Sequence, residues 1–350
     1  RFLQASPLNA HVNVHLSVSG LELYHAANLM KDKASGPDGW EAKPLLKLPQ
    51  IWWDAVADLW TSVMKNGDIP ARWVEARIAL IPKPDGGTRP LGITSLLWRV
   101  GAKVYVSKLR PWVMSWANHQ TLGGLAGRGV MDAHHRICHA AKSYHDNAVF
   151  VSQDLSKFFD KVNIEQAVLV LEHLQAPAEW VRLLKHFYSS HLRMFSSHGY
   201  VHSKWVTAKR GLLQGCPFSP IVASAVMYIW SCHVCRYDLG VDGCTYLDDR
   251  TFWTLPGASP NALSDAIHRS DAFDQLFGLG LNRDKCQVVA KNDVSVNHFG
   301  AHHFNYGPCK SKLEVLGLVY DLHDLGYMHM KNDKVALLQA RLKYIRAGVW

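Results

Sequence analysis

The chain has 350 residues, with 38 Lys and Arg against 29 Asp and Glu, a formal net charge of +9, and 48% hydrophobic residues. This composition excludes a disordered, collagen-like or coiled-coil chain and predicts a large core divided over two or three packed lobes. The positive charge indicates an anionic partner, either nucleic acid or a membrane surface. The longest apolar stretch, 221–234, is too short and too interrupted to span a membrane.

The two ends of the chain and its cysteines indicate its context. The sequence begins at Arg1 rather than Met and stops at Trp350 inside a helical pattern, so we expect a piece of a longer polyprotein. Seven cysteines, an odd number, are scattered through apolar surroundings. This usage is typical of a reducing, intracellular compartment.

The first half of the chain predicts helices interrupted by short strands. Apolar residues at helical spacing predict helices over 21–30, 51–64, 95–116 and 132–145, and Trp52, Trp53 and Trp60 are core candidates. β-rich runs predict a hairpin of 76–81 and 90–93, with a Gly-Gly turn at its tip, and a strand over 148–151. A glycine-rich stretch, 123–129, leads into the fourth helix.

The second half continues this pattern and indicates an α+β fold. The expected elements are a long helix over 164–188, a hairpin over 192–206, an apolar helix over 221–234, two strands within 243–254, a helix over 264–277, strands over 287–290 and 315–320, and a terminal helix whose apolar face includes Val335, Leu338, Leu342 and Ile345.

Two acidic sites are the most informative feature of the sequence. Asp154 follows the strand predicted at 148–151, and Asp248-Asp249 stand at the tip of a predicted tight hairpin. Carboxylates opposed at strand ends suit two Mg²⁺ ions about 3.5–4 Å apart, which stabilise both oxygens of an in-line phosphoryl displacement. An Asp-Asp pair alone is also typical of a solvated turn, so the acidic residues by themselves leave both interpretations open.

Motifs that follow one another in a fixed order around these aspartates favour the metal-site interpretation. Asp154-Leu-Ser-Lys-Phe-Phe-Asp160, Arg210-Gly-Leu-Leu-Gln-Gly-Cys-Pro-Phe-Ser-Pro220 and Tyr246-Leu-Asp-Asp249 resemble the successive palm motifs of reverse transcriptases, most closely those of non-LTR (LINE-type) retrotransposons. Further resemblances are the segments 33–39, 81–90 and 278–285, together with Leu316-Gly317 in the region similar to the primer grip. The sequence departs from the non-LTR pattern at Leu247, where Ala is usual.

The resemblance implies a metal-dependent catalytic centre. Asp154 and Asp248 are the implied principal metal ligands and Asp249 a secondary carboxylate beside them, so these three are both the catalytic and the metal-binding residues. Mg²⁺ is the expected cofactor, with Mn²⁺ as an alternative. The protein then mainly positions its substrates and screens their charge. For Asp160 we expect a structural, hydrogen-bonding role.

The resemblance also implies which residues bind the nucleotide. Phe159 stands where the family carries the aromatic side chain that leaves no room for a 2′-hydroxyl, and Phe158 points to the opposite face if the backbone is extended. Lys83 and Arg89 flank the hairpin tip that would contact the phosphates. The alternative interpretations are that Phe159 is an ordinary core residue and that Lys83 and Arg89 are ordinary surface charges.

Three more residues complete this implied set. Gln214 and Gly215, with Ser219-Pro220, would start a helix whose first turn faces the nucleotide and template. Lys285 resembles the lysine that protonates the departing pyrophosphate. A solvated loop lysine is the alternative for this residue.

The expected fold is α+β, a right-hand polymerase with fingers and palm, an antiparallel palm sheet packed on helices, and a largely missing thumb. We expect the N-terminal extension and fingers at 1–147, the palm at 148–330 and the start of the thumb at 331–350. Part of 161–210 packs with the fingers in an alternative division.

The implied function is RNA-directed DNA polymerase activity, in which retroelement RNA is copied by two-metal-ion nucleotidyl transfer to a primer 3′-hydroxyl. The expected partners are an RNA template, a DNA primer or nicked target DNA, and deoxynucleoside triphosphates, with no membrane and a nuclear location. Two alternatives stay open: a degenerate fragment that binds RNA without polymerising, and a group II intron-type maturase.

Overall fold

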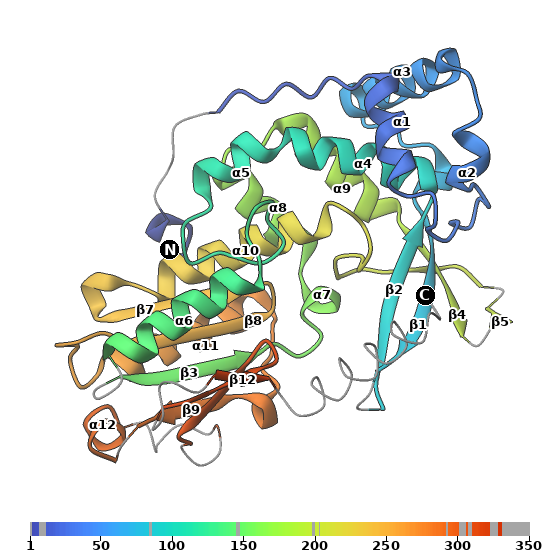
Figure 1. Ribbon diagram of the computed structural model, residues 1–350. Coiled ribbons are helices and arrows are strands. Elements are labelled where there is room, and N and C mark those ends of the chain that lie inside the picture. The colour runs from blue at the N-terminus through green and yellow to red at the C-terminus, as the bar shows by residue number, and fades with distance from the viewer. Residues whose placement is uncertain are drawn as a thin grey trace. The chain divides into compact units, whose positions relative to one another are not determined.

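The computed structural model describes residues 2–6, 12–83, 86–144, 148–197, 200–202, 204–291, 293–300, 306, 310–322 and 328–330. Contacts divide the chain into two compact units, each with its own sheet structure (Figure 1). Unit 1 comprises Leu3–Asn118 and Lys157–Val226, and unit 2 comprises Phe2, His119–Ser156 and the chain from Met227. The assignment of fingers, palm and thumb to residue ranges stays a prediction.

Unit 1 combines a mixed sheet with helices. Strand β1 pairs antiparallel with β2, which confirms the predicted hairpin, and parallel with β4, a pairing that the sequence does not predict. The predicted hairpin over 192–206 is present as β4 paired with β5 and with β6. The elements of this unit are η1 (Leu3–Ala5), α1 (Gly20–Asn28), α2 (Ala42–Leu45), α3 (Gln50–Asn66), η2 (Ala71–Trp73), β1 (Glu75–Pro82), β2 (Thr88–Thr94), α4 (Leu96–Lys108), α5 (Arg110–Trp116), α7 (Phe158–Lys161), α8 (Ile164–His173), α9 (Ala178–Ser190), β4 (Leu192–Ser197), β5 (Tyr200–Val201) and β6 (Val206–Thr207).

Tryptophan rings form much of the unit 1 core. Trp53 and Trp60 of α3 are fully buried, as expected, whereas Trp52 is half-buried. The Trp60 ring lies 5.4 Å from the Trp98 ring, and its Nε1 donates a hydrogen bond of 3.2 Å to the Leu97 carbonyl. Aromatic pairs of this kind add to the free energy gained from area burial.

Two helices predicted as continuous are each broken in two. The expected helix over 95–116 is α4 followed by α5, with Pro111 in the first turn of α5, where a missing N–H costs least. The expected helix over 164–188 is α8 followed by α9, and Gln175, with φ 54°, and Pro177 separate them. A left-handed residue and a proline end a helix more strongly than apolar spacing extends it.

Unit 2 contains a four-stranded, wholly antiparallel sheet in the order β7-β8-β3-β9. The elements are α6 (Val130–Tyr144), β3 (Val149–Asp154), η3 (Tyr237–Leu239), β7 (Val241–Tyr246), β8 (Asp249–Thr254), α11 (Ala262–Phe277), η4 (Arg283–Lys285), β9 (Gln287–Ala290), α12 (Asp293–His298), β10 (Lys312–Val315), β11 (Leu318–Asp321) and β12 (Met328–Met330); α10 (Ser219–Val234) runs across the boundary of the two units.

Helices of unit 2 cover this sheet. Ile137 of α6 packs in one cluster with Phe150 of β3 and Trp253 of β8. Side chains alternate along a strand, so Gln153 and Arg250 lie on the other face, where Gln153 accepts from Ser270 of α11. No helix among the described residues is long and apolar enough to cross a membrane.

The single strand predicted over 315–320 is wrong. The structure has a hairpin there, because Leu316 and Gly317, with φ 49° and 83°, form a two-residue turn between β10 and β11. Positive φ at both central residues is the mark of a type I′ hairpin turn. The helix expected from Val335 to Ile345 lies outside the described residues.

Candidate active site

The predicted catalytic aspartates lie at neighbouring strand ends of unit 2. Asp154, the last residue of β3, is the direct antiparallel partner of Asp249, the first residue of β8, and Asp249 is also paired with Tyr246 of β7. Directly opposed residues project from the same face of a sheet with Cβ atoms about 5 Å apart. Asp154, Asp248 and Asp249 are all half-buried, so each can be reached from solvent.

Asp248 occupies a tight turn. Leu247 and Asp248 alone connect the paired residues Tyr246 and Asp249, and Leu247 has φ 56°. Glycine, Asn or Asp normally take this left-handed conformation, and a branched side chain there is strained. Strain of this kind is typical of functional sites, where the surrounding structure enforces it.

The donor set suits Mg²⁺. Like charges directly opposed on neighbouring strands repel, and a cation would offset the repulsion between Asp154 and Asp249. Within the described ranges, no group of three or more His, Cys, Asp or Glu side chains forms a metal cage. Mg²⁺ usually takes one or two carboxylates and completes its shell with water and substrate phosphates, so the oxygen donors present fit this ion.

The segment that contains Lys285 is joined to the end of β3. The amide of Ser156 donates to the Gly280 carbonyl at 2.7 Å, and the amide of Asn282 donates to the Asp154 carbonyl at 2.8 Å. Lys285 ends the short helix η4 directly after this pairing, and its side chain is exposed. Burial raises the pKa of the next residue, the Cys286 thiol, so that thiol stays neutral beside the lysine.

Unit 1 carries the other predicted nucleotide-binding residues. In the β1–β2 hairpin, Arg89 pairs with Ile81, and the Lys83 amide donates to the Gly87 carbonyl at 2.7 Å. The side chains of Lys83 and Arg89 are exposed on the same hairpin. Residues 84 and 85 of its tip lie outside the described residues.

Gln214 and Gly215 lie against β2. The Gly92 amide donates to the Gln214 carbonyl at 2.5 Å, and Gly215 has φ 113°. A Cβ at Gly215 would lie 2.4 Å from the Gly92 carbonyl oxygen, so only glycine fits. Helix α10 begins at Ser219, which places both residues in the preceding loop and not in the first turn of a helix. Gln214 lines a cavity of about 220 Å³ together with Asp160 and Arg193.

Phe158 and Phe159 have different surroundings, although the local backbone is the short helix α7 and not an extended strand. Phe158 is buried, with 2% of its surface exposed, and Phe159 is half-buried. The Phe159 carbonyl accepts a 2.6 Å hydrogen bond from the Leu212 amide, which ties α7 to the loop before Gln214. Phe159 is therefore the phenylalanine of the two with surface left for a ligand.

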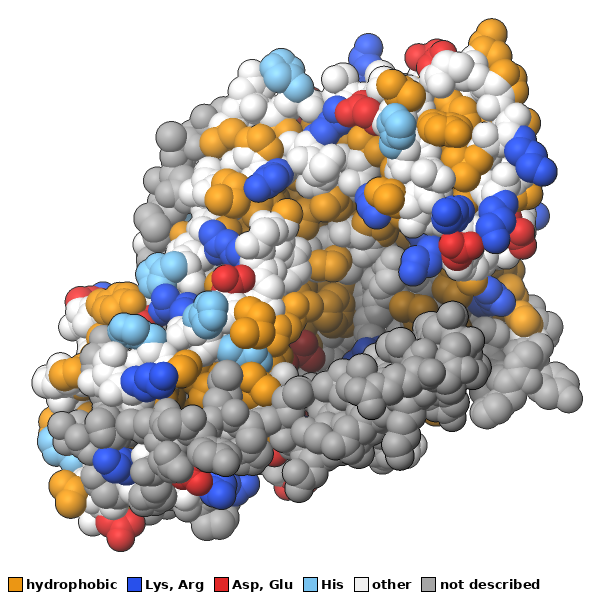
Figure 2. All heavy atoms as spheres, in the orientation of Figure 1, with side chains coloured by type: hydrophobic (Ala, Val, Ile, Leu, Met, Phe, Trp, Pro, Cys, Tyr) orange, Lys and Arg blue, Asp and Glu red, His pale blue; other side chains and the backbone are white. Residues whose placement is uncertain are grey.

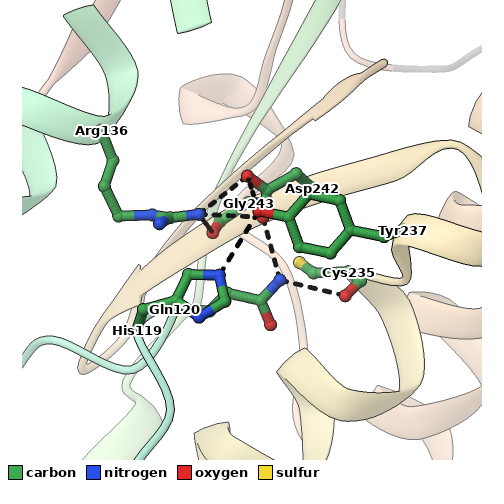
Figure 3. A network of polar contacts seen from close by, with 7 residues as sticks. All are labelled: His119, Gln120, Arg136, Cys235, Tyr237, Asp242 and Gly243. Atoms are coloured by element: carbon green, nitrogen blue, oxygen red, sulfur yellow. Dashed lines mark hydrogen bonds and ion pairs between the residues drawn. The ribbon is translucent and has the colours of Figure 1, made fainter. Parts of the chain in front are cut away.

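The sequence does not single out a polar network centred on Asp242 (Figure 3). Arg136 Nη2 donates to both carboxylate oxygens of Asp242 at 2.9 and 2.8 Å, the Tyr237 hydroxyl donates to Oδ2 at 2.9 Å, and Gln120 Nε2 donates to Oδ1 at 2.9 Å. These residues come from four separate segments, so no local pattern reveals them. The network fixes the start of β7, the strand that leads to Leu247.

Positive charge collects on one part of unit 1. Figure 2 shows Lys and Arg side chains, with acidic ones between them, over the region of α1 and α2. The exposed lysines of this region are Lys31, Lys33, Lys43 and Lys47. Such a group suits a polyanion, although the 3.0 Å ion pair of Lys43 with Asp32 offsets part of the charge.

The comparisons of this chain with known protein sequences agree on one family. Residues 81–320 match the family model described as reverse transcriptase (RNA-dependent DNA polymerase). The chain is 22% identical over 222 residues to the retrovirus-related Pol polyprotein from type-1 retrotransposable element R2 of Nasonia vitripennis, a match that covers 56% of this chain and 19% of that protein. It is 26% identical over 216 residues to the transposon TX1 uncharacterized 149 kDa protein of Xenopus laevis, covering 57% of this chain and 16% of that protein. The match thus spans less than a fifth of either curated relative.

Solved structures show the fold. The chain resembles apo telomerase from Candida tropicalis truncated from its C-terminal domain, with TM-score 0.52, 12% identity, and coverage of 81% of this chain and 61% of that chain. It also resembles Candida albicans telomerase in complex with a TWJ fragment of telomeric RNA, with TM-score 0.50, 15% identity, and coverage of 81% and 50%. The predicted α+β right-hand polymerase fold is confirmed.

Proposed function

Because the chain belongs to the reverse transcriptase (RNA-dependent DNA polymerase) family, a class of nucleotidyltransferases, we propose that it copies retroelement RNA into DNA by adding deoxynucleotides to a primer 3′-hydroxyl. The observation that carries this proposal is the direct pairing of Asp154 with Asp249 beside the turn that contains Asp248. This pairing brings three half-buried carboxylates to one edge of the sheet. Carboxylates in this arrangement suit a reaction in which metal ions bind negatively charged phosphate groups.

The three aspartates have a defined task in this proposal. Asp154 and Asp248, with Asp249 beside them, would hold Mg²⁺, which when bound lowers the pKa of the primer hydroxyl and neutralises charge on the leaving pyrophosphate. Hydrogen bonds of β3 with β8 and of the Asp154 carbonyl with Asn282 fix the backbone that carries two of these carboxylates. Catalysis then depends on carboxylates held in place before the substrate arrives.

The remaining predicted residues select and hold the nucleotide. The exposed cations Lys83 and Arg89 bind its phosphates, and Lys285 gives a proton to the departing pyrophosphate. Phe159 presents a ring that excludes the 2′-hydroxyl of a ribonucleotide. The backbone at Gly215, which no other residue can adopt, allows the template or nucleotide to approach closely.

The names of the curated relatives suggest that the template comes from a mobile element. Both belong to mobile elements, as their names state, so we propose that the template is element RNA and that the primer is the 3′-end of nicked target DNA. We also propose a nuclear location, because the target DNA would be nicked there. The lysines around α1 and α2 would contribute a contact to nucleic acid that weakens as salt is raised.

Primer extension tests the proposal. The full chain is incubated with poly(rA), oligo(dT), dTTP and Mg²⁺, and is compared with Asp248→Asn and with the control Asp58→Asn, an exposed residue of α3. We expect wild type and control to extend the primer and Asp248→Asn to lose at least about 100-fold in rate. Equal rates would overturn the assignment of Asp248. A wild-type chain that binds the RNA but never extends the primer would be a binding module.

A further inference from the structure

A short segment of unit 2 runs beside strand β7 and reaches the aspartate-bearing turn. The Thr245 amide donates to the Gln120 carbonyl at 2.8 Å, and the Leu122 amide donates to the Thr245 carbonyl at 2.9 Å. Thr121 and Thr245 form an isolated parallel bridge. Residues 120–123, which we call the β7 strap, therefore extend the edge of the sheet next to the turn.

The end of the β7 strap touches the turn itself. A Cβ at Gly123 would lie 2.3 Å from the Leu247 amide nitrogen, 2.7 Å from the Tyr246 carbonyl carbon and 2.9 Å from Leu247 Cγ. Two of these atoms are backbone, so a side-chain rotation cannot relieve the overlap. Gly123 has no positive φ, which means that the site requires glycine for space and not for conformation.

The other end of the β7 strap is anchored by the Asp242 network (Figure 3). Gln120 Nε2 donates to Asp242 Oδ1 at 2.9 Å and to the Cys235 carbonyl at 3.1 Å, and both Gln120 and Asp242 are buried. Arg136 neutralises Asp242 from α6. Gln120 is anchored at Asp242, near the start of β7, and Gly123 contacts the turn at the end of β7, so the β7 strap is held at both ends of that strand.

We propose that Gly123 is a positioning residue that holds the Leu247-Asp248 turn in its strained conformation. We also propose that Gln120 anchors the β7 strap, which carries Gly123. This inference rests on the proposed function, because it assigns the contact a purpose in presenting Asp248 to metal and substrate. The left-handed conformation of Leu247 is strained, and the backbone of Gly123 occupies the space that the turn would need to relax. An added methyl group would displace the turn by about 1 Å, and a misplacement of that size can cost about 100-fold in rate.

The test compares Gly123→Ala with Gly129→Ala. Gly129 belongs to the same glycine-rich stretch, but a Cβ there would meet only Asp132 Oδ2, at 3.9 Å. For each variant of the 350-residue chain we would measure kcat and KM for dTTP, Mn²⁺ affinity by electron paramagnetic resonance, and Tm. We expect Gly123→Ala to lower kcat by about 10- to 100-fold and to weaken Mn²⁺ binding severalfold, with KM within about twofold. Gly129→Ala should match wild type.

Two outcomes would overturn the inference. A folded Gly123→Ala protein with the kcat and Mn²⁺ affinity of Gly129→Ala would show that the contact positions nothing, and a lower Tm alone would make Gly123 purely structural. If Gly123→Ala does not fold, Gln120→Met, which removes the anchor without adding bulk, must weaken Mn²⁺ binding and lower kcat in the same direction. An inactive wild type would overturn the proposed function, whereas the Mn²⁺ comparison would still decide the role of Gly123.

Discussion

Arg250 and Asp274 form a two-pronged ion pair inside unit 2. Nη1 of Arg250 donates to Oδ1 of Asp274 at 2.7 Å and Nη2 donates to Oδ2 at 2.6 Å, and the two side chains are 0% and 7% exposed. The guanidinium carbon also lies 4.8 Å from the centre of the Trp230 ring. Because Arg250 directly follows Asp249, this pair connects the strand of the candidate site to α11.

Loss of the carboxylate from this pair should destabilise the protein strongly. Asp274→Ala leaves a buried guanidinium without its counter-charge, and we expect the free energy of unfolding to fall by about 3–5 kcal/mol. Urea unfolding followed by tryptophan fluorescence measures this change. Glu172→Ala is the control, because its 2.7 Å pair with Lys185 is exposed and such pairs contribute at most about 1 kcal/mol. Equal losses of unfolding free energy in the two variants would mean that the buried pair of Arg250 with Asp274 stabilises the protein no more than an exposed pair does.

The two neighbouring phenylalanines should have separable effects. Phe159→Ala opens space at a half-buried position, and we expect the ratio of kcat/KM for ribonucleotides over deoxynucleotides to rise while stability changes little. Phe158→Ala is the matched control: Phe158 is 2% exposed, so its loss should cost about 3–5 kcal/mol of stability and leave the sugar preference unchanged. Single-nucleotide incorporation with dTTP and UTP gives the ratio. An unchanged ratio for Phe159→Ala would remove its assignment as the sugar gate.

Lys83 should act on nucleotide affinity. Its ammonium is exposed next to the β1–β2 tip, and the loss of one charge-assisted hydrogen bond to a phosphate is expected to raise the KM for dTTP roughly tenfold, or about 1.4 kcal/mol. Steady-state primer extension measures KM. Lys65→Ala, an exposed lysine of α3, removes the same charge and should leave KM as in wild type. If both variants shift KM alike, the effect of Lys83 is one of net charge only.

Local signals in the sequence predict much of the candidate site. The Tyr246-Leu-Asp-Asp249 hairpin and the strand before Asp154 lie where short β-rich runs and turn residues indicate them. The direct register of Asp154 with Asp249 follows from no local pattern, because strand pairing is decided by packing of the whole sheet.

Contacts between distant segments escape sequence reasoning for the same reason. The parallel pairing of β1 with β4, the ion pair of Arg250 with Asp274 and the fit of Gly123 against Leu247 each join residues that nothing in the sequence relates to one another. Gln175 is a case of a different kind, since a non-glycine residue at φ 54° gives no sign of the helix end that it forms.

Acid should destabilise the protein through His191. This side chain is buried, its Nδ1 lies 2.8 Å from the Val74 carbonyl, and in the part of the chain that the structure describes its Nε2 has no partner. Burial lowers the pKa of His191 to about 4, against the opposing effect of the Val74 carbonyl and with a smaller contribution from Arg193. The folded protein therefore holds this imidazole neutral well below its ordinary pKa of about 6.5.

The sign of the pH effect follows from this lowered pKa. Between about pH 6.5 and pH 4 the unfolded chain binds a proton that the folded chain does not, so the stabilisation is complete above pH 6.5 and is lost as the pH falls. For this one group we expect the free energy of unfolding to drop by about 2 kcal/mol between pH 7.5 and pH 5. Urea unfolding of wild type and His191→Asn, which keeps a donor for Val74, measures the difference. The variant should show the shallower pH dependence, and parallel curves would mean that His191 is protonated in the folded protein as readily as in the unfolded chain.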